Sequence, residues 1–162
     1  MENIIATLES KKRDKMRAPF QILAVPYCFI ENELYFCVFR RADSDVWQFI
    51  AGGGEDDETP FEAAKRETIE EMCIDPINIK QLICIAYVPA EVIAENKRQH
   101  WDKNTYVIPE YPFAFECNAD PTISREHCEY KWLPYDVARK LLKWDSNKVA
   151  MYEIMCRLRN YE

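Results

Sequence analysis

The three glycines of this 162-residue chain stand side by side as Gly52, Gly53 and Gly54, and no other position is glycine. Glycine is the residue that tolerates a positive φ, or a neighbour too close for a Cβ. The preceding run, residues 46–51 (VWQFIA), is typical of a strand that leads into the glycines. The sequence therefore predicts an unusual backbone conformation, or a very close neighbour, at this one place.

A helix is predicted shortly after the glycines. Thr59 followed by Glu62 forms a capping box, and Pro60 falls at the first helical position, where its missing N–H costs nothing. We expect the helix to run from Pro60 to Met72. At about 100° per residue, its core-facing stripe would consist of Phe61, Ala64, Thr68, Ile69 and Met72.

Three carboxylates, those of Glu67, Glu70 and Glu71, share one flank of this helix. Glu67 and Glu71 are a like-charge pair at i,i+4, which destabilises a helix. A hard divalent cation removes that repulsion, and Mg²⁺ binds one or two carboxylates and completes its shell with water and substrate phosphates. A solvated acidic surface is the alternative. The glycines and the capping box favour a metal site, because they bring the acids to the mouth of a strand–loop–helix unit.

The remaining chain predicts a mixed α/β sandwich with a largely antiparallel or mixed sheet. Two apolar runs separated by a short polar break predict a hairpin over 20–39. Further strands are expected at 79–88, 105–117 and 130–133, a long loop at 89–104, and a helix at 134–143. Ser146 can cap a last helix with Val149, Tyr152 and Cys156 on its apolar side. We expect an N-terminal arm over 1–16 and a single domain over 17–162.

The amino-acid composition limits which partners the protein can bind and where in the cell it is expected. Lys and Arg number 21 against 28 Asp and Glu, a net charge of −7 that argues against a polymer of nucleic acid as partner. A small anionic substrate remains compatible if metal ions supply positive charge. No stretch is long and apolar enough for a membrane span, and the N-terminus lacks a secretory signal. Seven cysteines without a C-x-x-C pair predict free thiols in a reducing compartment, hence the cytoplasm.

The spacing of Gly52, Glu58 and the segment 66–74 (RETIEEMCI) resembles the Nudix box, the signature of hydrolases that act on nucleoside diphosphates linked to another group. Cys73 stands where that family usually has glycine, which bears on the helix exit more than on activity. Further similarity to the bacterial dATP pyrophosphohydrolase and dihydroneopterin triphosphate pyrophosphatase branch spans about residues 17–155. It rests on residues 46–49, 126–127, 130–133, Trp144 and 146–147.

The resemblance implies an α/β/α sandwich, with the loop–helix unit as its catalytic element. It implies that Mg²⁺ or Mn²⁺ is bound by the carboxylates of Glu67, Glu70, Glu71 and Glu126 and by the backbone carbonyl of Ala51. Arg66 would orient Glu67, and Glu58 would pair with Arg66. Glu67 is the first choice for the general base and Glu126 the second.

The expected reaction is attack by water on a phosphorus of a nucleoside or pterin triphosphate, releasing pyrophosphate and a monophosphate. Gly52 and Gly53 are expected to line the substrate site. Arg40 and Arg41 could hold phosphates, with solvated strand-end charges as the alternative. His100 and His127 are expected to be bystanders.

Two other functions stay open: a binding module for a nucleotide or nucleotide sugar, and a hydrolase of oxidised nucleotides or dinucleoside polyphosphates. Either a monomer or a homodimer is expected. Trp47, Trp101 and Trp132 could stack on a base or belong to the core.

Overall fold

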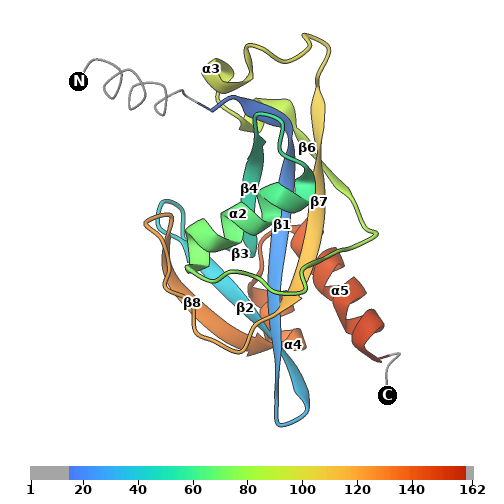
Figure 1. The fold of residues 1–162 in the computed structure, drawn as a ribbon. Coiled ribbons are helices and arrows are strands. Elements are labelled where there is room, and N and C mark those ends of the chain that lie inside the picture. The colour runs from blue at the N-terminus through green and yellow to red at the C-terminus, as the bar shows by residue number, and fades with distance from the viewer. Residues whose placement is uncertain (1–14, 160–162) are drawn as a thin grey trace, which may run out of the picture.

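The computed structural model describes residues 15–159, and a mixed eight-stranded sheet runs through them (Figure 1). Most of the expected N-terminal arm, residues 1–14, lies outside the described residues. The strands are β1 (Arg17–Ile30), β2 (Glu33–Arg41), β3 (Trp47–Gln48), β4 (Ile50–Glu55), β5 (Lys80–Gln81), β6 (Ala86–Pro89), β7 (Val107–Glu116) and β8 (His127–Pro134).

The long strand β1 organises this sheet. Along one edge it pairs antiparallel with β4 through its first half and with β2 through its end. Along the other edge it pairs in parallel with β7. The outer strands β3 and β8 pair with β2, and β5 and β6 pair with β7. The predicted hairpin and the mixed character of the sheet are therefore confirmed.

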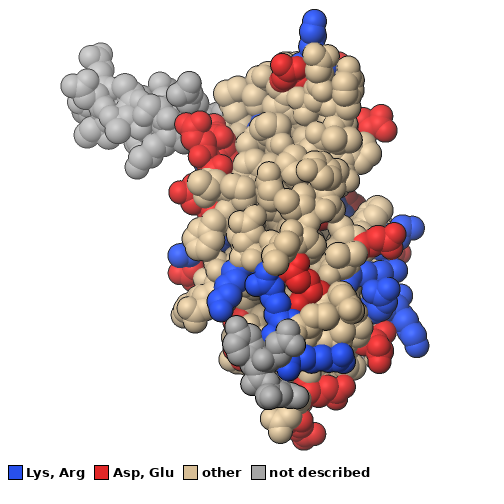
Figure 2. Space-filling view, turned by 90° about the vertical axis from the view of Figure 1, so that its right-hand side faces the viewer, with Lys and Arg blue, Asp and Glu red and all other residues tan. Residues whose placement is uncertain are grey.

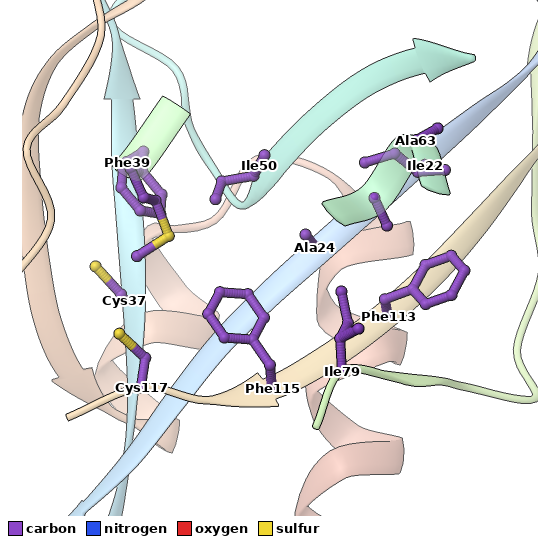
Figure 3. Close-up of a cluster of buried hydrophobic side chains, with 12 residues drawn as sticks. Ile22, Ala24, Cys37, Phe39, Ile50, Ala63, Ile79, Phe113, Phe115 and Cys117 are labelled. Atoms are coloured by element: carbon purple, nitrogen blue, oxygen red, sulfur yellow. The ribbon is translucent and has the colours of Figure 1, made fainter. Parts of the chain in front are cut away.

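Helices cover both faces of the sheet. The helix α2 (Pro60–Met72) packs on the face that carries Ile22 and Ala24, where a buried cluster also includes Phe113 and Phe115 (Figure 3). The helices α4 (Tyr135–Leu141) and α5 (Asp145–Arg159) pack on the opposite face, against Leu23 of β1. Successive residues of β1 thus alternate between two cores, and the expected α/β/α sandwich is confirmed.

The glycines lie within β4 as ordinary extended strand, and none has a positive φ. The expectation of an unusual backbone conformation is wrong, and the alternative, a very close neighbour, is what the structure shows. A Cβ on Gly52 would overlap the carboxyl group of Glu67, and one on Gly54 would overlap the ring of Phe20. These positions require small volume and not backbone freedom.

The helix α2 has the predicted bounds and the predicted capping box. Its buried face is rotated toward the acidic flank. Phe61 and Ile69 are 48% and 43% exposed, whereas Ala63 and Glu71 are buried. The absence of side chains at Gly52–Gly54 explains the difference, because it lets the acidic flank, through Glu67, lie directly against the backbone of β4.

Two segments also depart from the expectations. The strand expected at 79–88 divides into β5 and β6, and the loop at 89–104 contains the short helices η2 (Ala90–Val92) and α3 (Glu95–Arg98). In α5, the buried residues are Asn147, Ala150, Met151 and Ile154, while Val149 and Tyr152 are exposed. Apolar residues occur around most of this helix, so periodicity alone does not identify its buried side.

Charged side chains are unevenly distributed over the surface of the molecule. Seen from the side of β7 and α5, uncharged atoms dominate the upper part of the molecule, and charged side chains gather in the lower part (Figure 2). All seven cysteines lie within residues 15–159 and are free thiols, as expected. Within the same residues no helix has the length and apolarity to cross a bilayer.

The C-terminus of α2 has a non-glycine residue in the left-handed conformation. Cys73 caps the helix with φ 56° and ψ 33°, and its N–H donates to the carbonyl of Ile69. The left-handed conformation costs a residue with a Cβ about 1–2 kcal/mol. We expect Cys73→Gly to raise the free energy of unfolding by about 1 kcal/mol in urea denaturation. Cys73→Ala is the control, and an equal gain in Cys73→Ala would assign the effect to loss of the thiol.

Candidate active site

The guanidinium of Arg66 joins the three parts of the strand–loop–helix unit. Its Nε and Nη2 donate to the two carboxylate oxygens of Glu58 at 2.8 and 2.9 Å. Its Nη2 also donates to the carbonyl of Gly53 in β4 at 2.8 Å, and its Nη1 donates to Glu67 Oε1 at 2.9 Å. A further bond from Nη1 reaches Glu70 Oε2 at 3.2 Å. Charge-assisted and bidentate bonds of this kind fix geometry as well as contribute energy.

The carboxylate of Glu67 lies directly over the backbone of Gly52, in the space that a larger residue would fill. The Glu67 side chain is only 12% exposed. Burial raises the pKa of Glu67 to about 7, although Arg66 acts in the opposite direction. The charges of Glu70 and Glu71 add to the rise.

Glu71 has a separate set of partners, contributed by the loop before β8. Ser124 Oγ donates to Glu71 Oε2 at 2.5 Å, and His127 Nδ1 lies 3.1 Å from the same oxygen. The backbone N–H of Ser124 donates to the Glu71 carbonyl at 3.3 Å. Burial opposes ionisation of Glu71, but His127 and Ser124 outweigh it and lower its pKa. His127, expected to be a bystander, therefore positions a carboxylate.

Glu126 approaches Glu71 from the same loop. Pairing of β2 with β8 brings it there, and the N–H of Ala42 donates to the Glu126 carbonyl at 2.9 Å. Burial, together with the charge of Glu71, raises the pKa of Glu126. The two carboxylates are therefore close enough for the charge of one to oppose ionisation of the other.

A cleft of about 1510 Å³ extends from these acids across the face of the sheet. Of the residues predicted for the site, those that line this cleft are Glu67, Glu70, Glu126, Ala51, Gly52, Gly53 and Arg41. Glu71, Arg66 and Glu58 lie behind them, in the contacts described above. Arg40 does not line it, because its guanidinium pairs with Asp45 and Glu129.

Arg17 is a cleft residue that no sequence motif indicates. Its guanidinium lies against Gly53, where a Cβ would overlap it. The 89–104 segment holds its backbone, because Trp101 Nε1 donates to the Arg17 carbonyl and His100 Nε2 lies 2.7 Å from that oxygen. Burial lowers the pKa of Arg17, and the charge of Glu67 opposes that shift. Within the described part of the chain, no carboxylate forms an ion pair with Arg17, in contrast to Arg41, which is bound by Asp43.

The acids at the mouth of the cleft fit a hard divalent cation in their chemistry. They offer carboxylate oxygens alone, and the charge of Glu71 opposes ionisation of Glu126, a repulsion that a cation would relieve. Residues 15–159 contain no ready-made cluster of three acidic, imidazole or thiol ligands. Mg²⁺ does not require one, because water and substrate phosphates supply most of its shell.

Comparisons with known proteins agree with this arrangement. The family model of the NUDIX domain matches residues 23–153. The solved structure of a Listeria monocytogenes protein assigned to the NUDIX hydrolases has a TM-score of 0.75 and 43% sequence identity, covering 89% of this chain and 97% of the other.

Dihydroneopterin triphosphate diphosphatase from Escherichia coli K12 is 28% identical over 146 residues, which are 88% of this chain and 97% of that protein. A solved structure of the E. coli dihydroneopterin triphosphate pyrophosphohydrolase has a TM-score of 0.66 and 27% identity, covering 86% of this chain and 97% of that one.

The burial of Glu67 predicts a pH dependence of stability. A carboxyl group with a folded pKa of about 7, above its unfolded value near 4.3, stabilises the fold below pH 4 and loses that contribution as pH rises through 7. We expect the difference in unfolding free energy between Glu67→Gln and the metal-free wild type to grow by about 2–3 kcal/mol from pH 4.5 to 8. Chemical denaturation in EDTA measures it, and a difference independent of pH would contradict the assignment.

Proposed function

Because this chain belongs to the NUDIX domain family and is a hydrolase of phosphoanhydride bonds, we propose that it cleaves a nucleoside or pterin triphosphate to a monophosphate and pyrophosphate. The proposal includes dependence on Mg²⁺, with Mn²⁺ as a substitute. The observation that carries it is the convergence of Glu67, Glu70 and Glu126 on one cleft, beside the arginine Arg17.

The proposed metal ligands are the carboxylates of Glu67, Glu70, Glu71 and Glu126 and the backbone carbonyl of Ala51. A divalent cation bound there would neutralise phosphate oxygens and lower the pKa of a bound water. The fit is supported by the oxygen-only donor set. It is also supported by the repulsion between the charges of Glu71 and Glu126, which a cation would relieve.

Glu67 is the proposed general base. A base works best when its pKa lies near the operating pH, and that of Glu67 is raised by burial to about 7. Arg66 holds one oxygen of Glu67 at 2.9 Å and leaves the other oxygen able to accept a proton from water. Glu126, whose pKa is also raised, is the second candidate.

Positive charge for the phosphates would come from Arg17 and Arg41, which both line the cleft. Arg17 is the stronger candidate, because the guanidinium of Arg41 already forms two hydrogen bonds with the carboxylate of Asp43. The earlier candidate Arg40 is not part of this proposal. Gly52 and Gly53 would line the substrate site by letting Glu67 and Arg17 lie close against the β4 backbone, beside the triphosphate.

The proposal extends to the organisation of the protein. We propose one catalytic domain over 17–162, supported by a family match over 23–153, and a cytoplasmic location, supported by seven free thiols. Every residue in the proposed mechanism comes from a single chain, so a monomer or a homodimer would serve.

The activity is tested with Mg²⁺ and a panel of triphosphates, following pyrophosphate release. We expect Glu67→Gln and Glu71→Gln to lower kcat by at least about 100-fold, whereas Glu33→Gln, at an exposed hairpin position, keeps wild-type activity. EDTA should abolish turnover and Mg²⁺ should restore it. Absence of turnover by the wild type, with retained nucleotide binding, would favour the binding-module alternative instead.

Arg17 is tested by its effect on KM. Loss of a charge-assisted contact to phosphate costs about 1.5–3 kcal/mol, so Arg17→Gln should raise KM by about 10-fold or more. Arg139→Gln, on the exposed side of α4, is the matched control. Equal KM values for Arg17→Gln and the wild type would remove Arg17 from the site.

A further inference from the structure

The far part of the cleft is floored by a row of residues that cross three paired strands. Gln21 of β1 lies opposite Gly53 of β4 and also opposite Glu110 of β7. All three line the cleft. With strands spaced about 4.8 Å apart, the backbone of Glu110 lies roughly 10 Å from that of Gly53, and hence from the neighbourhood of the acids.

Glu110 is a buried carboxyl group whose partners are all neutral. Its residue is 4% exposed. Gln21 Nε2 donates to Glu110 Oε2 at 2.6 Å, and Ser146 at the start of α5 acts with Gln21 to oppose the rise in the pKa of Glu110 that burial causes. Among the described residues, no Lys, Arg or His pairs with it within 4.0 Å. Burying a carboxylate without a cation lowers the stability of the fold. The packing around Glu110 gives no structural reason for a carboxylate at this position.

The carboxylate still has acceptor capacity toward the cleft. A carboxylate offers about four lone-pair sites, and the hydrogen bond from Gln21 uses one of them. On the other edge of β7, Glu110 pairs with Ala86 of β6, whose small side chain leaves space beside it. Both neutral donors favour the ionised form, although burial raises the pKa of Glu110.

We propose that Glu110 selects the substrate's ring by accepting two hydrogen bonds, from a ring N–H and from the adjacent exocyclic amino group of a 2-amino-4-oxopyrimidine edge. Guanine and pterin share this edge. The proposal rests on the hydrolase function above and identifies the ring of its substrate.

The pattern of hydrogen-bond donors and acceptors distinguishes this edge from the corresponding edges of adenine and hypoxanthine. Two parallel N–H donors match the two oxygens of one carboxylate, as in bidentate arginine pairs. Adenine instead presents an acceptor nitrogen beside its amino group, so one lone pair would face the carboxylate. Hypoxanthine has the ring N–H but lacks the amino group, and therefore keeps only one of the two bonds.

The surroundings of Glu110 suit a flat ring. Trp144 lies two residues before Ser146 and lines the cleft, with its indole N–H donating to Gln48 Oε1 at 3.1 Å. Tyr87 of β6 also lines the cleft and is 65% exposed. The three tryptophans singled out from the sequence, Trp47, Trp101 and Trp132, are not among the lining residues. Arg17 lies against Gly53 and lines the same cleft, where it could meet a triphosphate attached to the ring.

The test measures dissociation constants and kcat/KM at pH 8 for dGTP, dITP, dATP and dihydroneopterin triphosphate. The wild type should bind dGTP about 10-fold more tightly than dITP, the value expected for one hydrogen bond to a charged group. It should bind dGTP more tightly still than dATP. Relative kcat/KM for dGTP and the pterin then identifies which ring the cleft prefers. Equal or tighter binding of dATP by the wild type would overturn the proposal.

Glu110→Gln should reduce the preference for dGTP over dITP to less than about 3-fold, while Glu116→Gln, at an exposed position of the same strand, should retain it. An unchanged preference in Glu110→Gln would contradict the assignment. If Glu110→Gln does not fold, the wild-type comparison alone decides. Selective binding of dGTP without hydrolysis would refute the proposed activity and leave this inference standing.

Discussion

The cation of Arg66 is the interaction on which the site depends. It is the only group in the strand–loop–helix unit of residues 50–72 that contacts β4, the loop and α2 together, through Gly53, Glu58 and Glu67. Without it, several carboxylates would repel one another beside the three glycines of β4, which have no side chains to hold them. The network raises the pKa of Arg66, with the hydrogen bonds that Arg66 donates to Glu58 as the largest cause. The charge therefore remains in place at any pH that the fold survives.

The acids of α2 form two groups that differ in their chemistry. Glu67 and Glu70 are bound by the permanent charge of Arg66, whereas Glu71 is bound by the neutral or titratable groups of Ser124 and His127. The pKa of Glu67 is raised and that of Glu71 is lowered. Two residues of one helix turn are thus suited to different tasks, one to hold a proton and one to hold a charge.

Local signals predicted the helix α2 well. The capping box, Pro60 and the spacing of the box residues act over a few positions, and α2 has the bounds they indicate. Contacts between distant segments were not accessible in this way. His127 meets Glu71 only because β8 pairs with β2, and Glu110 meets Gln21 only because β7 pairs with β1. The prediction of which side of α5 is buried was wrong for a related reason. The helix has several apolar stripes, and packing against the sheet decides which of them is covered.

The pairing of β1 with β7 also bears on how the molecule assembles. Gln21 and Glu110 are 89 positions apart in the chain, and parallel pairs over such separations form slowly because a long loop must first be closed. The hairpin of β1 and β2 can form early, from neighbouring residues. On the ribosome, the pocket around Glu110 would appear only after β7 and the start of α5 have emerged, well after the hairpin of β1 and β2.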